Sequence, residues 1–115
     1  MSARTYSSQV VAAPQTYAAE KLNAKCKPSF IMVDNSLGAA DRIITIRDHF
    51  TPVVTNGVPA PVPVQNIDRL TFTVVITGCV SLRDELKDLV ILGELRAYAN
   101  AVDPGCLITI AWDHE

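Results

Sequence analysis

Residues 68–102 constrain the fold more than any other part of the chain, because an alternating segment is followed there by the longest segment with helical spacing. Residues 69–77 carry apolar side chains at every second position, the pattern of a strand in an antiparallel sheet that is covered on one face. Ser81 and Asp84 then have the spacing of a helix N-cap and its capping-box partner. We therefore predict a strand, a short turn and a long helix.

The predicted helix, residues 81–102, is apolar on more than one side. Its first half carries one narrow apolar stripe, whereas the apolar residues of its second half spread over the opposite side. A helix of this kind needs more than one surface to bury it, so we expect its own sheet on one side and a partner subunit on the other. The residues expected at the dimer interface are Leu89, Ile91, Leu92, Leu95 and Tyr98.

Three further segments favour β-strands. Residues 29–33 are predicted to form a buried strand, and residues 41–50 alternate between apolar and polar side chains. After a stop signal at residues 103–105, residues 106–112 are predicted to form a short final strand. The fold class expected from these elements is α+β: an antiparallel meander with a long helix packed on one face, in an intertwined dimer, with an extra terminal strand.

The N-terminal part is less regular. Residues 1–16 are rich in small and polar side chains and are expected to form an extended arm or an edge strand. Residues 16–25 favour a short helix with Thr16 as its N-cap, and a strand is the alternative. The length of 115 residues predicts a single domain that spans residues 1–115.

The main connection, residues 51–66, combines a turn signal with four prolines. Because proline donates no ladder hydrogen bond, this segment is excluded from a central strand, and its alternation with Val and Ala favours an extended, projecting conformation. We expect this loop to contact neighbouring dimers. Its candidate residues are Asn56, Gly57, Pro59, Pro61 and Pro63.

The composition favours an oligomer over a small soluble monomer. Hydrophobic residues make up 49% of the chain and charged residues only 19%, and the mean hydropathy is +0.21. The net charge of −2 gives no global signature of nucleic-acid binding. Residues 1–40 carry four basic and two acidic side chains, whereas residues 81–115 carry three basic and seven acidic side chains. This difference indicates either two differently charged faces or a chance asymmetry.

Catalysis is not expected from this sequence. It contains no P-loop, dinucleotide-binding, zinc-protease or serine-hydrolase motif. Cys26, Cys79 and Cys106 lack metal-site spacing and are interpreted as small buried residues, with an intersubunit disulfide left open. We predict no metal, no cofactor and no small-molecule substrate. The absence of a secretory segment and of a membrane-length apolar run predicts synthesis in the cytoplasm without a membrane partner.

One face of the alternating strands carries arginine and threonine side chains that are able to contact phosphates and base edges. The alternative is an ordinary exposed sheet face without aromatic stacking residues. The RNA-facing candidates are Arg42, Thr45, Arg47, His49, Arg69, Thr71 and Thr73.

In order, four segments within residues 42–101 resemble the pre-loop strand, the long loop, the last strand and the helix of the coat proteins of single-stranded RNA bacteriophages. They read RIITIRDHF, TNGVPAPVPV, DRLTFTVVITG and SLRDELKDLVILGELRAY. The resemblance implies that two subunits join their sheets edge to edge, that each helix crosses the partner, and that the other sheet face contacts RNA.

The function that this resemblance implies is a structural capsid protein, which forms dimers and self-assembles into an icosahedral shell around single-stranded RNA. It would be part of the virion and would assemble in the host cytoplasm. The chain departs from the family in residues 1–40, in its strand after the helix and in its few basic residues. The alternative is another phage structural component, a tail, decoration or scaffold protein, without nucleic-acid contact.

Overall fold

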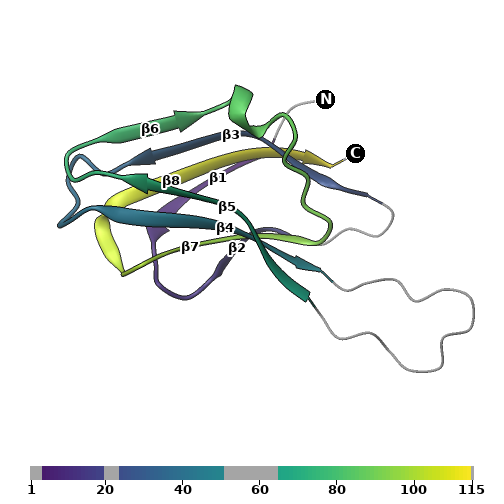
Figure 1. Cartoon of the computed structure of the whole chain (residues 1–115), viewed down its shortest axis with the longest axis horizontal. Coiled ribbons are helices and arrows are strands. Elements are labelled where there is room, and N and C mark those ends of the chain that lie inside the picture. Colours follow the sequence, from purple (N-terminus) through teal and green to yellow (C-terminus); the bar gives the residue numbers. More distant parts are fainter. Residues whose placement is uncertain (1–3, 20–23, 51–64, 115) are drawn as a thin grey trace, which may run out of the picture.

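Two four-stranded antiparallel sheets pack face to face in the computed structural model, which describes residues 4–19, 24–50 and 65–114 (Figure 1). The strand order is β1-β8-β3-β6 in the first sheet and β2-β7-β4-β5 in the second. The strands are β1 (Arg4–Val10), β2 (Gln15–Ala18), β3 (Cys26–Asp34), β4 (Arg42–Phe50), β5 (Gln65–Val74), β6 (Cys79–Leu82), β7 (Glu94–Ala99) and β8 (Asp103–His114). A short 3₁₀ helix, η1 (Asp84–Leu86), lies between β6 and β7.

The chain crosses repeatedly between the two sheets. Of the eight strands described, only β4 and β5 are both consecutive in sequence and paired with each other. The central strand β8 pairs with β1 on one side and with β3 on the other, so its partners lie far away in the sequence. Most of the sheet therefore depends on contacts between distant segments.

The core lies between the sheets and is built from alternate residues of the central strands. Ile31 and Val33 on β3 meet Ile44 and Ile46 on β4, and all four side chains are fully buried. Burying a side chain of this size stabilises the fold by about 1.5–3 kcal/mol. Ile108 on β8 belongs to the same cluster. The core therefore holds the two sheets together through aliphatic side chains from both of them.

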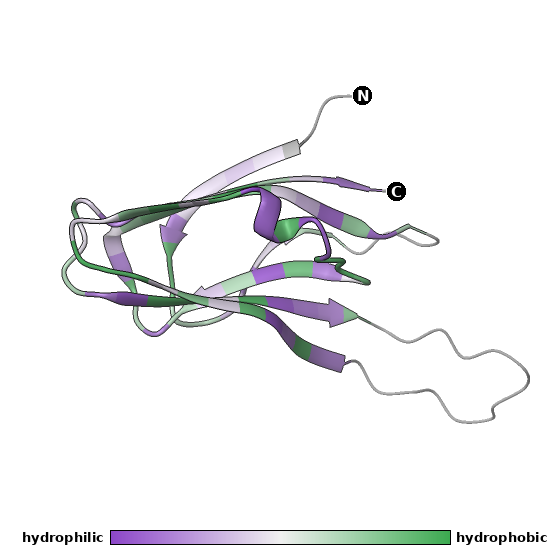
Figure 2. Cartoon of the chain, turned by 45° about the horizontal axis from the view of Figure 1, so that its top comes forward, coloured by the Kyte–Doolittle hydropathy of each residue, from purple (hydrophilic) through white to green (hydrophobic). Residues whose placement is uncertain are grey.

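The prediction of a long helix over residues 81–102 is wrong, and so is the α+β class. This segment forms the end of β6, then η1, an irregular connection and β7, and the described residues contain no α-helix. Along β7 the inward residues Leu95 and Ala97 alternate with partly exposed neighbours, and Figure 2 shows this as alternating hydrophobic and hydrophilic bands. The apolar residues that suggested a two-sided helix therefore belong to one face of a strand and to the connection that precedes it.

Gly93 shows why a helix does not fit at this point. A Cβ atom there would collide with the carbonyl oxygen of His49 and with Phe50. The chain is therefore pressed against the end of β4, where it enters β7 as a new strand of the second sheet. Glycine, which has no Cβ atom, permits this close approach of the two backbone segments.

The helix that was expected to form the dimer interface is absent from the described residues, and its five interface candidates lie in different environments. Ile91 and Leu95 are fully buried in the core of their own chain, and Leu89 packs partly buried against it. Leu92 is 44% exposed, and Tyr98 lies on the outer side of β7. These five residues therefore do not share one surface: Leu95 and Tyr98 lie on opposite faces of β7, and Leu89, Ile91 and Leu92 lie in the connection before it.

The strands predicted from simple alternation lie where the sequence indicated. Residues 29–33 fall within β3, residues 42–50 form β4, and residues 106–112 fall within β8. At the N-terminus β1 is an edge strand paired with β8, and residues 15–18 form β2 instead of a helix. No helix in the described residues is long and apolar enough to cross a membrane.

The loop that was expected to contact neighbouring dimers lies outside the described residues. This applies to all of its candidates, Asn56, Gly57, Pro59, Pro61 and Pro63.

Leu95 and Leu92 provide a direct test of the strand assignment. We expect Leu95→Ala to lower the free energy of unfolding by about 3 kcal/mol, because it leaves a cavity in the core. Leu92→Ala should change it by less than about 0.5 kcal/mol, since this side chain is largely exposed. Urea unfolding of both variants measures the difference. Equal losses in the two variants would contradict the assignment.

Candidate functional site

The outer face of the second sheet collects most of the residues that the sequence marked as RNA-facing. Thr45, Arg47, His49, Thr71 and Thr73 lie together on it, at outward positions of β4 and β5. The term outer face is used here for these five residues and their neighbours on the same side: Thr16, Ile43, Asn66, Asp68, Glu94, Arg96 and Tyr98.

Arg47 is the central cation of the outer face, and its charge is already paired. Its Nε donates to Asp68 Oδ1 at 2.8 Å, and a terminal nitrogen donates to the Tyr98 hydroxyl at 3.1 Å. The Tyr98 hydroxyl donates in turn to the other Asp68 oxygen at 3.1 Å. The hydrogen bond with Asp68 raises the pKa of Arg47, and the same bond lowers the pKa of Asp68. Both groups therefore stay charged and bound to each other at neutral pH.

Arg96, the second cation, is also paired. Its Nε and a terminal nitrogen donate to Glu94 Oε1 at 2.9 and 2.7 Å, and the Thr16 hydroxyl donates to the same oxygen at 3.1 Å. Partial burial alone would raise the pKa of Glu94, but the hydrogen bonds from Arg96 and Thr16 outweigh it, and the pKa is lowered. This pair adds no net charge to the outer face.

The remaining polar groups of the outer face are neutral or bonded to each other. His49 Nδ1 lies 2.7 Å from Asn66 Oδ1, and the Thr71 hydroxyl lies 3.5 Å from that of Thr45. With two arginines and two carboxylates, the described part of this face has no net charge when His49 is neutral. Binding to a phosphate backbone depends on cations that can replace counterions, so the outer face has little electrostatic attraction for RNA.

Arg42 does not belong to the outer face. Its position on β4 has the inward parity of Ile44, and its side chain is only 9% exposed. Its Nε donates to Asp103 Oδ2 at 2.9 Å. The backbone N–H groups of Ala39 and Gly105 donate to the same carboxylate at 2.9 and 3.1 Å. The Asp103 carboxylate therefore joins residues 39–42 to residues 103–105, and Arg42, as its partner, is not available to a ligand.

Arg69 is also directed away from the outer face. The pairing of β4 and β5 shifts between Ile46 and Arg47, which is a β-bulge that leaves Arg69 without an opposite residue. Its guanidinium donates twice to Asp48 Oδ2, at 2.9 and 3.1 Å. Asp48 is fully buried and also accepts the backbone N–H groups of Leu92 and Gly93, each at 3.0 Å. Arg69 is therefore a partner of a buried carboxylate.

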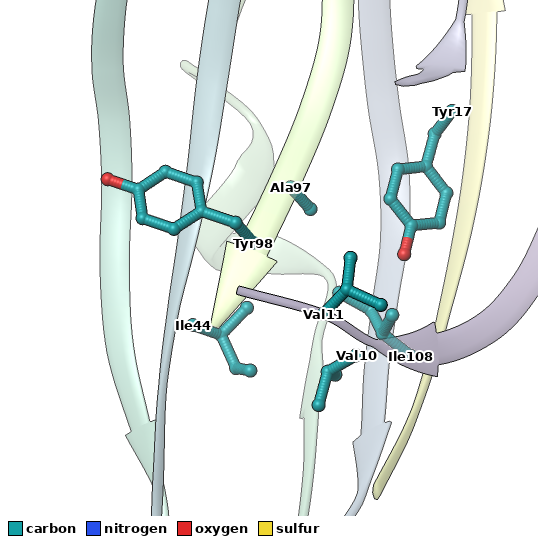
Figure 3. Close-up of a pocket in the computed structure, with 7 residues that line it drawn as sticks. All are labelled: Val10, Val11, Tyr17, Ile44, Ala97, Tyr98 and Ile108. Atoms are coloured by element: carbon teal, nitrogen blue, oxygen red, sulfur yellow. The ribbon is translucent and has the colours of Figure 1, made fainter. Parts of the chain in front are cut away.

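The gap between the two sheets is not a ligand pocket. Figure 3 shows the seven residues that line it, with the ring of Tyr98 directed away from Val10 and Ile108. The enclosed space is too narrow to admit a water molecule. Tyr17 lies on the opposite side of this gap, where its hydroxyl lies 2.9 Å from that of Ser8. Its pKa is raised, mainly by burial.

The two buried thiols lack the environment of a catalytic nucleophile. Burial raises the pKa of Cys26 to about 12 and that of Cys106 to about 11, so both are protonated at neutral pH. Cys79 is exposed, and none of the three forms a disulfide within the chain. No group of three His, Cys, Asp or Glu side chains within the described residues is arranged to hold a metal ion.

The carboxylates were the residues that sequence reasoning missed. Asp48 and Asp103 anchor the two buried ion pairs, and Asp68 and Glu94 neutralise the outer face. Alternation carried a signal for Asp48, because it occupies the inward parity of Ile44 and Ile46 on the same strand. A carboxylate at an inward position requires a partner. The position of Asp48 in the sequence therefore indicated a buried ion pair or hydrogen bond.

No protein-family model, no curated protein and no solved structure matches the chain.

The Asp103 carboxylate predicts a pH dependence of stability. Hydrogen bonds from Ala39 and then from Arg42 outweigh its desolvation and lower its pKa below 3.8. A carboxylate with a depressed folded-state pKa stabilises the fold above its unfolded-state pKa, and this contribution is lost as the pH falls through the folded-state value. We expect the urea midpoint of Asp103→Asn to lie below that of the natural chain at neutral pH, and the two midpoints to converge below about pH 4.

Asp88→Asn is the matched control, because Asp88 is exposed and has no partner in the described part of the chain. Its midpoint should follow that of the natural chain at every pH. A constant gap between Asp103→Asn and the natural chain from pH 7 to pH 3 would contradict the assignment.

Proposed function

We propose that this chain is a non-catalytic structural subunit that self-associates through the open edge of β5 and builds a larger protein assembly. The observation that supports the proposal is that β5 is a long edge strand, unpaired along one side in the described residues. In the described residues β5 pairs with β4 on one side only. It is ten residues long and is the longest of the four edge strands.

The second half of β5 lacks the usual protection of an edge strand. Leu70–Val74 contains no charge, proline or glycine, and its β-branched and aromatic residues favour strand pairing. Natural edges are usually blunted by charges, bulges or short length. The first half of β5 has such protection, with Asp68, Arg69 and the bulge, but the second half does not.

Exposed apolar side chains surround this unprotected half. Val75 and Ile76, which follow β5 directly, are 58% and 44% exposed. Ile43, which lies opposite Thr73 on β4, is 46% exposed. Two copies related by a two-fold axis would pair β5 with β5, since a two-fold interface uses the same patch on both subunits, and this apolar surface would border the contact. The second sheet of one copy and the second sheet of the other would then form one continuous sheet.

The second candidate function is the RNA-enclosing coat protein that the sequence resemblance implied. It is favoured by one observation, the grouping of Thr45, Arg47, His49, Thr71 and Thr73 on one sheet face, where Thr45 itself is buried among its neighbours. It is opposed by the pairing of Arg47 with Asp68 and by the use of Arg42 and Arg69 in buried contacts. The coat family's dimer also requires a long helix, which the described residues lack. We therefore favour the structural component without nucleic-acid contact.

Thr73→Lys tests the edge. Thr73 is exposed on the unprotected half of β5, and a lysine there would place two charges close together across a β5–β5 contact. We expect the variant to remain folded and to become monomeric, with self-association weakened at least about tenfold, which corresponds to about 1.4 kcal/mol. Light scattering coupled to size-exclusion chromatography, over a range of concentrations, measures the mass.

Thr5→Lys is the matched control, because Thr5 is an exposed threonine on β1, the edge strand of the other sheet. It should assemble as the natural chain does. The proposal is overturned if the natural chain is monomeric at high concentration, or if both lysine variants assemble normally.

RNA binding separates the two candidate functions. We expect a labelled single-stranded RNA to show no change in fluorescence anisotropy with the chain at about 150 mM salt, because the outer face carries no net charge. Purified assemblies should show the absorbance spectrum of protein alone. Binding that Arg47→Gln abolishes would instead support the coat-protein role, while the edge contact through β5 would be judged separately by its own variants.

A further inference from the structure

A shallow depression on the first sheet has a different charge from the outer face. It lies where the start of β3 meets η1 and the end of β8, and its volume is about 250 Å³. Its buried floor is formed by Pro28 and Leu86. Around this floor lie Lys27, Ser29, Arg83, Lys87 and Asp113.

Arg83 is the cation that distinguishes this depression. Arg42, Arg47, Arg69 and Arg96 each form an ion pair with a carboxylate of this chain. Arg83 forms none with the described residues, and its guanidinium instead stacks at 4.6 Å on the ring of Phe30. Stacking fixes the plane of a guanidinium and leaves its N–H groups free to donate. Unlike these four arginines, Arg83 is held in place with its charge unpaired among the described residues.

The two lysines are brought to the same place by a contact between distant segments. Lys27 Nζ donates to the backbone carbonyl of Lys87 at 3.3 Å, which holds the residue after η1 against the start of β3. Asp113 lies opposite Lys27 in the β3–β8 register, and no ion pair joins the two side chains. Three cations and one carboxylate give the rim a formal charge of +2.

We propose that this depression binds a phosphate dianion, either free or as the terminal group of a small phosphomonoester. The charge of the rim matches a dianion, and the guanidinium of Arg83 offers the paired donors that suit phosphate oxygens. The apolar floor of Pro28 and Leu86 reduces solvent on one side of the anion and strengthens its attraction to the cations. The volume is below the roughly 300–1,000 Å³ of pockets for drug-sized ligands, which favours a small anion.

Backbone amide NMR of the full chain tests the site. At constant ionic strength, sodium phosphate at pH 7.5 should shift the amide signals of Lys27, Arg83 and Lys87 in a saturable way, whereas sodium chloride should not. Glycerol 1-phosphate is titrated in parallel to distinguish a free anion from a phosphomonoester. We expect Arg83→Gln to weaken phosphate binding at least about tenfold through the loss of charge-assisted hydrogen bonds.

The control is Lys25→Gln, which removes the same unit of charge from an exposed side chain that does not line the depression. It should bind phosphate as the natural chain does. Saturable binding of either probe that Arg83→Gln weakens and Lys25→Gln does not supports the site, and binding of only one probe identifies which form it takes. Shifts no larger than those with chloride, or equal losses in both variants, overturn it. The result is independent of assembly through β5, because the monomeric Thr73→Lys variant serves equally well.

Discussion

The buried carboxylate of Asp48 is the interaction on which the second sheet depends. It fixes the entry to β7 by accepting the N–H groups of Leu92 and Gly93, and it holds Arg69 on the inner side of β5. A fully buried charge is stable only when it is paired and hydrogen-bonded, so these contacts must form together. Because Arg69 is bulged inward, Asp68 comes opposite Arg47. One buried carboxylate therefore decides the register of β5 and also the neutrality of the outer face.

This arrangement separates the charges of the chain by role. Arg42 and Arg69 stabilise the junctions of loops and strands, and Arg47 and Arg96 are neutralised on the outer face. The unpaired cation Arg83 lies on the other sheet, beside η1. Three cations and one carboxylate line the depression there, in a chain whose formal net charge is −2. Pairing, rather than the number of arginines, decides which surface attracts an anion.

The fold could be predicted from the sequence wherever one strand carries its own alternation. Residues 29–33 and 42–50 are such cases, and the same alternation correctly grouped Thr45, Arg47 and His49 on one face. Arg42 has the inward parity of Ile44, but it was expected to face RNA because its residue type suggested a surface. The prediction of a helix over residues 81–102 was wrong because Leu86, Ile91 and Leu95 belong to η1, to the connection and to β7. Their spacing along the sequence nevertheless matches that of a helix. The bulge at Arg69 depends on contacts with Asp48, which in turn binds residues 92–93. It therefore cannot be predicted from the sequence pattern of β5 alone.

The same correction changes the physical basis for assembly. Much of the apolar surface that suggested a partner for a helix is buried within the chain itself, since Ile91 and Leu95 are fully buried. Among the large apolar side chains that remain exposed, Ile43, Val75 and Ile76 lie next to an unprotected strand edge. Apolar exposure beside unpaired backbone groups is a stronger basis for association than either feature alone, because the ladder hydrogen bonds fix the register and the side chains supply burial. Self-association thus depends on the open edge of a sheet and not on the surface of a helix.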